Sequence, residues 1–145
     1  MKFEIRISTG PDDKRKSHSV RGFTRLTEAC AAAFGVSSAL QSDPNMLVAV
    51  WLPKARRHHS ACLCVTRPTS HKSHTDLVAN CEHSLQVEVA KRKASDARWK
   101  FLGAQGRDAG ETFAAINSDD SARDAFFRND LATVEKFLAT RGATA

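Results

Sequence analysis

Apolar and polar residues alternate strictly at the start of the chain, where residues 2–8 read K-F-E-I-R-I-S. Side chains two residues apart lie on the same face of a β-strand. The segment therefore predicts a strand that buries Phe3, Ile5 and Ile7 against a core and presents its charged residues on the other face. One strand is not stable alone, so this pattern requires partner strands and a layer that covers the apolar face.

Two short apolar runs later in the sequence predict the partner strands. Residues 46–52 and 61–67 are each followed or closed by a proline, Pro53 and Pro68, a residue that is confined to strand edges and ends. The residues between the two runs, 54–60, are interpreted as a basic hairpin connection.

A helix is predicted between the first strand and these two runs. Residues 25–34 carry apolar side chains at helical spacing, with Thr24 as the N-cap and Gly35 as the left-handed residue after the helix end. Residues 14–18 lack any apolar anchor, so we expect them to form an exposed, mobile loop.

Apolar residues in the middle of the chain fit both a helical and a strand period. Apolar residues in segment 77–89 are spaced by four, as on one face of a helix, but those from Leu85 onward also alternate, as in a strand. We predict a short helix over 75–82 and a strand over 84–91. Residues 99–102 are interpreted as a further strand or a helical turn.

The last third of the chain is predicted to be helical, after a glycine-rich loop at residues 103–110. Ser118 is the predicted cap of the first helix. The apolar spacing of four, three and four from Phe127 to Leu138 allows one continuous helix, whereas a cap at Asn129-Asp130 predicts a hairpin of two helices, which we favour. Residues 129–143 (N-D-L, V, F-L and G-A) resemble the second half of an ankyrin repeat. The motif occurs once, so the resemblance implies a helix pair and no repeat array.

These elements predict one α+β domain over residues 1–145. Its body, residues 1–110, is a small, mainly antiparallel sheet with one early helix packed on it, and residues 111–145 form a C-terminal helical hairpin. A chain of this length buries a core without needing disulfides or a metal. No apolar run is long enough to cross a bilayer, and the N-terminus lacks the apolar core of a secretory signal. We therefore expect a cytoplasmic protein without a membrane partner.

The positive charge of the chain is concentrated in its first half. The sequence has 22 Lys and Arg against 16 Asp and Glu, a net charge of +6; residues 1–74 hold 12 and 5 of them, and residues 75–145 hold 10 and 11. A one-sided basic surface attracts polyanions and favours counterion release from nucleic acid. Phe23 and Trp51 are the aromatic residues nearest to the basic segments. The residues predicted to bind nucleic acid or an acidic partner are Lys14, Arg15, Lys16, Arg21, Arg25, Lys54, Arg56 and Arg57.

Histidine and cysteine residues gather in segment 58–83, which holds eight of the ten in the chain. Zinc takes four nitrogen and sulfur ligands. Alternation along a strand would place Cys62 and Cys64 on one face, where they could share a metal. The alternative is that the cysteines are small residues of the core. The candidate zinc ligands are His59, Cys62, Cys64, Cys81 and His83.

Part of the same segment resembles the HNH family of metal-dependent nucleases, through His58-His59 before a strand and Asn80 and His83 downstream. The resemblance implies a histidine general base and a metal at the scissile phosphate. The glycines and C-x-x-C pairs of that family are missing from this sequence. The chain also lacks a nucleophile elbow, a phosphate-binding loop and a dinucleotide fingerprint, so a non-enzymatic protein is favoured.

We expect a small basic protein that binds nucleic acid or a nucleoprotein complex through its basic loops. Two alternatives stay open. One is a protein-binding inhibitor or adaptor, of the kind that phages and mobile elements encode against host defence systems. The other is a zinc-containing domain or a metal-dependent nuclease.

Overall fold

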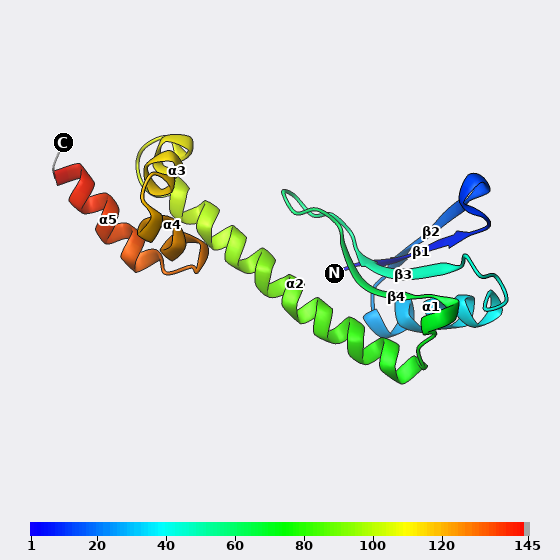
Figure 1. Cartoon of the computed structure of the whole chain (residues 1–145). Coiled ribbons are helices and arrows are strands. Elements are labelled where there is room, and N and C mark those ends of the chain that lie inside the picture. The colour runs from blue at the N-terminus through cyan, green and yellow to red at the C-terminus, as the bar shows by residue number, and fades with distance from the viewer. Residues whose placement is uncertain (144–145) are drawn as a thin grey trace. The chain divides into compact units, whose positions relative to one another are not determined.

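The computed structural model describes residues 1–143, which form a four-stranded sheet and five α-helices (Figure 1). The α+β class predicted from the sequence is confirmed. Contacts divide the chain into two compact units. We call Met1–Val89 the sheet-bearing unit and Ala90–Ala145 the helical unit; helix α2 (His74–Gly103) contributes to both. That the whole chain forms one domain stays a prediction. None of the described helices is both long and apolar enough to span a bilayer.

The other elements follow in chain order. They are β1 (Phe3–Thr9), β2 (Lys16–Phe23), α1 (Leu26–Ala39), β3 (Leu47–Leu52), β4 (Ala61–Thr66), α3 (Ala109–Asn117), α4 (Asp120–Phe127) and α5 (Leu131–Ala143), with short 3-10 helices at Asp12–Lys14 and Pro68–Ser70.

The sheet has the strand order β2-β1-β3-β4, and every neighbouring pair is antiparallel. The strands predicted over 2–8, 46–52 and 61–67 are confirmed. The alternation in β1 buries Phe3 and Ile5 in the core and places Glu4 and Arg6 on the opposite face. Because a slip of one residue would exchange the two faces, this pattern determines which face the helices cover.

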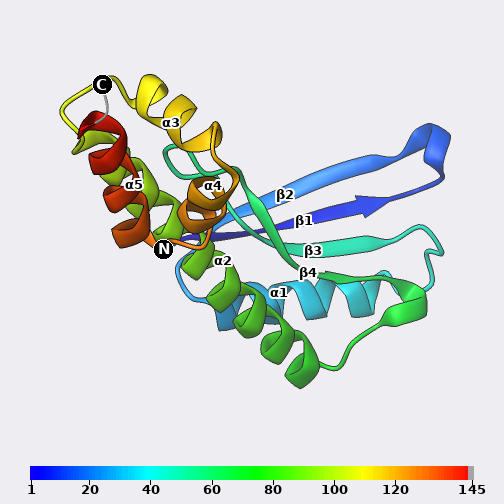
Figure 2. The same cartoon turned by 60° about the vertical axis from the view of Figure 1, so that its left-hand side comes forward.

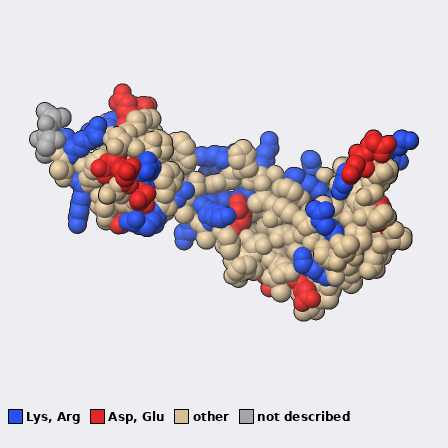
Figure 3. Space-filling model, in the orientation of Figure 1, with Lys and Arg blue, Asp and Glu red and all other residues tan. Residues whose placement is uncertain are grey.

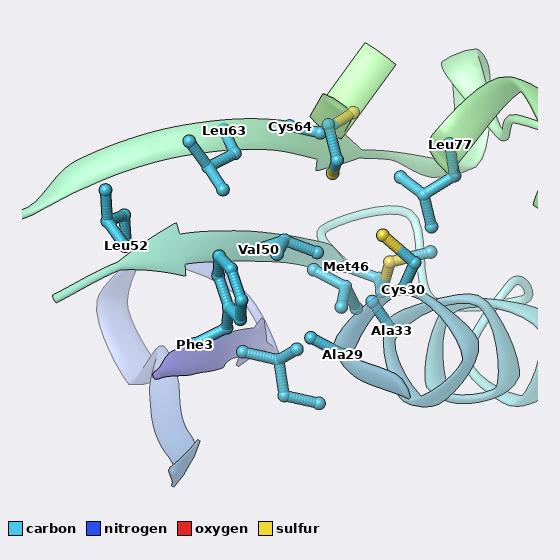
Figure 4. Packing of buried hydrophobic residues seen from close by; sticks show 13 residues of the cluster. Phe3, Ala29, Cys30, Ala33, Met46, Val50, Leu52, Leu63, Cys64 and Leu77 are labelled. Carbon is cyan, nitrogen blue, oxygen red and sulfur yellow. The ribbon is translucent and has the colours of Figure 1, made fainter. Parts of the chain in front are cut away.

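The core of the sheet-bearing unit lies between one face of the sheet and two helices. The two views of the chain show α1 and the first turns of α2 on that face (Figures 1 and 2). Buried side chains of the strands and helices meet there in one cluster (Figure 4), which includes Phe3, Ala29, Cys30, Ala33, Val50, Leu52, Leu63, Cys64 and Leu77.

Helix α1 is longer than predicted. It extends to Ala39 instead of ending at residue 34, so Gly35 lies inside it, and Thr24 does not cap it. Ser37 explains part of the extension. Its side chain is fully buried, and its hydroxyl donates to the carbonyl oxygen of Phe34 at 3.0 Å. Because this bond satisfies the hydroxyl within the helix, a polar residue is tolerated on the buried side.

Strand β2 replaces most of the mobile loop predicted over residues 14–18. It is an edge strand whose side chains are exposed from Lys16 to Gly22, so no apolar period marks it in the sequence. Backbone pairing with β1 holds it, from Phe3 opposite Phe23 to Thr9 opposite Lys16. Sequence patterning detects buried faces, and this strand has none.

One continuous helix occupies the segment where the sequence predicts a short helix and a strand, so the strand over 84–91 is wrong. Leu77 and Cys81 are buried against the sheet, but Val87 and Val89, whose alternation indicated a strand, are 42% and 38% exposed. The alternation therefore marks no buried face. Residues 88–102 belong to the same helix and are rich in Ala, Lys and Arg, which favour helix.

Helix α3 begins inside the segment interpreted as a glycine-rich loop. The carboxylate of Asp108 caps it by accepting a hydrogen bond from the backbone N–H of Glu111 at 3.2 Å. This D-x-x-E spacing is the sequence signal that marks the helix start. The next helix, α4, is capped by Asp119 and not by Ser118, which ends α3.

The division at 129–130 is confirmed and produces two successive helices. Asn129 has a positive φ of 59°, a conformation that Asn tolerates better than most residues. Asp130 accepts a hydrogen bond from the Thr133 hydroxyl at 2.7 Å in the first turn of α5. The helical unit has its own core, which includes Leu102, Ile116, Ala122, Ala125, Phe126, Val134 and Leu138.

Replacing Leu77 by alanine tests the packing of α2 on the sheet. The side chain is 1% exposed, so Leu77→Ala should lower the free energy of unfolding by about 2–5 kcal/mol. The control is Val87→Ala, on the exposed part of the same helix, which should change it by less than about 0.5 kcal/mol. Denaturant unfolding followed by circular dichroism measures both. Equal losses would contradict the helical register.

Candidate nucleic-acid interface

The sheet face opposite α1 is covered by no described helix of the sheet-bearing unit (Figure 1). Cross-strand neighbours lie on the same face of a sheet. The pairing places Glu4 of β1 between Arg21 of β2 and Trp51 of β3, and Arg6 follows two residues after Glu4. We call the surface formed by these four residues the open face.

Two arginines, a glutamate and a tryptophan form one connected group on the open face. Nη2 of Arg6 lies 2.6 Å from Oε1 of Glu4, and Nε of Arg21 lies 3.3 Å from Oε2. The guanidinium carbon of Arg6 lies 3.9 Å from the centre of the Trp51 ring, which is a cation–π contact. The Glu4 side chain is 5% exposed and that of Arg21 is 80% exposed. The carboxylate therefore holds Arg6 on Trp51, while most of Arg21 faces solvent.

The structure does not bring all the predicted basic residues together. Because β1 and β3 are antiparallel, the β1–β2 connection and the β3–β4 connection lie at opposite ends of the sheet. A seven-residue strand separates them by roughly 20 Å, at about 3.3 Å per residue. The first end carries Lys14, Arg15 and Lys16, and the second carries Lys54, Arg56 and Arg57.

Acidic residues make the two ends electrostatically different. Figure 3 shows Asp and Glu atoms beside the basic atoms at the β1–β2 connection, where Asp12 lies 3.5 Å from Arg15. The β3–β4 connection, residues 53–60, contains no acidic residue. Arg21 and Trp51 lie toward this second end, since both face Glu4 near the start of β1. Of the two ends, the β3–β4 end therefore has the larger net positive charge, and it adjoins the open face. Arg25 follows the end of β2 at this same end of the sheet, immediately before α1.

The five predicted zinc ligands do not all come together; of them, the thiols of Cys64 and Cys81 are in contact with each other. Among the described residues, no group of three or more His, Cys, Asp or Glu side chains is placed to hold a metal ion. His59 lies in the β3–β4 connection and His83 is exposed on α2. Cys64 and Cys81 are buried in the core, whereas Cys62 is exposed.

Cys62 and Cys64 lie on different faces, contrary to the prediction that a strand places both on one. The pairing of β3 with β4 shifts register between Val50 and Trp51, so Val50 is opposite Cys64 and Trp51 is opposite Cys62. Leu63 is the additional residue of this irregularity, and it is buried like Cys64. A bulge of this kind breaks the two-residue period. It places Cys62 beside the open face and Cys64 in the core.

Three buried cysteines do meet, and one of them was absent from the predicted set. The sulfur of Cys81 lies within hydrogen-bond reach of both Cys30 and Cys64, and its single S–H can donate to either, which joins α2 to α1 and β4. Nζ of Lys72 lies 3.7 Å from the sulfur of Cys64 and donates to the carbonyl oxygen of Val65 at 3.1 Å. The cluster thus forms part of the apolar core, with one cation at its edge.

These contacts separate the pKa values of the cysteines. The hydrogen bond from Cys81, aided by the charge of Lys72, lowers the pKa of Cys64 from 9.0 to about 6, against the opposing effect of burial. The hydrogen bonds to Cys30 and Cys64 raise the pKa of Cys81, and partial desolvation by neighbouring atoms raises that of Cys62, although its side chain reaches the surface. A thiolate at Cys64 is therefore stabilised by a donor and a cation.

The Arg6–Trp51 stack is the feature that the sequence prediction missed. The sequence marks Trp51 only as an aromatic residue near basic segments, and Arg6 only as part of the polar face of β1. The alternation places Arg6 on the outward face, but no local sequence pattern predicts the strand order that brings β1 beside β3.

Comparison with models of protein families, with curated proteins and with solved structures finds no match for this chain.

The titration of Cys64 tests the thiol cluster. Thiolate ultraviolet absorbance should rise with a midpoint near pH 6 in the unsubstituted protein. Lys72→Met should move the midpoint upward, because it removes the cation beside the sulfur, and Cys62→Ser should leave it unchanged. Since the folded-state pKa lies below that of the unfolded chain, the thiolate should also make unfolding free energy rise between about pH 6 and 9. A midpoint near 9 in the unsubstituted protein would contradict the cluster geometry.

Proposed function

We propose that the protein binds single-stranded nucleic acid on the open face, without sequence specificity and without catalysis. The observation that carries the proposal is the uncovered sheet face with Arg6, Arg21 and Trp51, adjoined by the basic β3–β4 connection. Proteins that bind single strands combine a positively charged surface for the backbone with aromatic side chains on which bases stack. Both components occur here on one face of one unit.

The charges indicate how the strand would be held. Arg21, being largely exposed, can contact phosphate while keeping its position beside Glu4. Lys54, Arg56 and Arg57 add three positive charges at the same end, with no acidic residue between positions 53 and 60. Such contacts position a nucleic acid but carry no sequence information. This arrangement supports binding to DNA or RNA of any sequence.

Binding should weaken steeply with salt. Each phosphate contact to a single strand contributes about 0.7 to the slope of log affinity against log salt concentration. Arg21→Gln and Lys54→Gln should each reduce that slope by about 0.7 and lower the affinity. Lys136→Gln, an exposed lysine of the helical unit, is the matched control and should leave both unchanged. Fluorescence anisotropy with a labelled oligonucleotide measures the slope, and affinity that stays constant from low to high salt would refute the proposal.

Trp51 should contribute to stacking, either where a base displaces the Arg6 guanidinium from its ring or where a base stacks on that guanidinium. Loss of one base–aromatic contact costs about 1–3 kcal/mol, so Trp51→Leu should weaken binding of an oligothymidine roughly five- to hundredfold. Trp51→Phe keeps an aromatic face and should lose less. The same anisotropy titration reports both variants, with circular dichroism as the control for folding. Equal affinity of Trp51→Leu and the unsubstituted protein would exclude stacking on this face.

The edge strand β2 favours a second candidate, the protein-binding inhibitor or adaptor. A strand at a sheet edge presents unpaired backbone groups to which another chain can add a strand. β2 has such an edge over eight residues, because β1 is its only neighbour in the sheet. A partner captured through β2 would stay bound after nuclease treatment, whereas one bridged by nucleic acid would be released.

A further inference from the structure

A pocket of about 330 Å³ lies in the helical unit, between the end of α2 and helices α3 and α4. This volume is at the lower end of the range for small-molecule sites. Almost all of its lining is apolar, and its main lining side chains are Arg98, Trp99, Leu102, Phe113, Phe126 and Phe127. The pocket is formed within the helical unit alone.

Aromatic rings give the pocket its floor and its rim. Phe113, Phe126 and Phe127 contact one another edge to face, with ring centres 5.4–6.4 Å apart, an arrangement that holds rings in fixed orientations. Phe126 is 3% exposed, while Phe127 and Trp99 are 55% and 49% exposed. Large exposed aromatic side chains beside a pocket are typical of binding sites.

Arg98 is the only charged residue that lines this pocket. Its guanidinium carbon lies 5.7 Å from the ring centre of Phe127 and 6.0 Å from that of Phe126, and Nη1 donates to the side-chain oxygen of Asn129 at 2.7 Å. Among the described residues it forms no ion pair. A positive charge therefore faces an apolar pocket with donors left for a ligand.

Asn129 fixes the position of that guanidinium. Its amide nitrogen donates to the carbonyl oxygen of Ala94 at 3.1 Å while its oxygen accepts from Arg98. Through these two bonds the Asn129 side chain, from the α4–α5 junction, is held against α2. Asn129 is thus a positioning residue, because it contacts the arginine and does not line the pocket.

We propose that this pocket binds a hydrophobic carboxylate: a ligand with one aromatic or branched apolar body and a single carboxyl group. The body would replace water against the phenylalanine rings, and the carboxylate would pair with Arg98, whose planar fork matches two carboxylate oxygens. A cationic ligand would be repelled by Arg98. A neutral ligand would gain the apolar contacts but not the charge-assisted hydrogen bonds.

Phenylacetate and phenylacetamide are a matched pair of probes, since they share the ring and differ in the charged group. A Trp51→Phe background leaves Trp99, at the pocket rim, as the only tryptophan that reports binding by fluorescence. Phenylacetate should change the fluorescence of Trp99 in a saturable way. It should bind at least about tenfold more tightly than phenylacetamide. Equal affinities, or no saturable binding of the acid, would overturn the proposal.

Variants separate the roles of the two polar residues. Arg98→Met should remove the preference for acid over amide and leave amide binding unchanged, while Arg98→Lys should keep part of it. Asn129→Gly tolerates the positive φ but lacks the amide, so it should weaken acid binding severalfold. Arg107→Met, an arginine outside the pocket, is the control, and thermal unfolding by circular dichroism checks that each variant is folded. An Arg98→Met protein that is folded and still prefers the acid would refute the assignment.

The carboxylate could belong to a free small acid or to the end of a polypeptide. The tripeptide Gly-Gly-Phe with a free carboxyl end, compared with its amidated form, distinguishes the two sources. Tighter binding of the free-ended peptide than of phenylacetate assigns the site to chain ends, and the reverse order assigns it to small acids. A peptide and an acid that both bind no better than their amides would contradict the proposal for both sources.

Discussion

The nearly complete burial of the Glu4 carboxylate constrains the sheet-bearing unit most strongly. A charged group removed from water is costly unless it is paired and hydrogen-bonded. Arg6 and Arg21, from two neighbouring strands, supply both oxygens of Glu4 with partners. The same contact places the Arg6 guanidinium over Trp51 of a third strand. One ion-pair group therefore links β2, β1 and β3 on the face that no helix of the unit covers.

This linkage means that stability and the proposed binding use some of the same residues. Removing Arg6 would leave a buried carboxylate short of a partner, so a loss of binding in such a variant would not separate folding from recognition. Arg21 is largely exposed, and Lys54 lies outside the group. Charge removed at these two positions therefore reports binding more cleanly.

Sequence patterning predicted the parts of the fold whose side chains are buried with a regular period. The alternation from Phe3 to Ile7 and the apolar runs of β3 and β4 are of this kind, and all three strands were found. β2 was missed because its residues from Lys16 to Gly22 are exposed and show no apolar period. The strand predicted in α2 was wrong because Val87 and Val89 alternate without being buried. Local patterns carry no information on a bulge such as the one at Val50–Trp51, which separates Cys62 from Cys64.

The sequence identified several residues of the candidate site but not their arrangement. The basic residues of the β3–β4 connection and Trp51 were named, but their union with Arg6 and Arg21 depends on the strand order. The buried Cys30–Cys81–Cys64 cluster depends equally on tertiary packing, since its members lie on α1, α2 and β4. The pocket around Arg98 belongs to the other compact unit, so its ligand and the nucleic acid can be tested independently.

Mapping a bound oligonucleotide on the protein by amide chemical shifts tests the central claim most directly. The account predicts that titration with a short oligothymidine shifts the amides of β1, β2 and β3 around Glu4, Arg6, Arg21 and Trp51, and those of the β3–β4 connection. The amides of α1, on the opposite side of the sheet, should stay in place. Shifts confined to the helical unit, or spread over α1 and not over the open face, would contradict it.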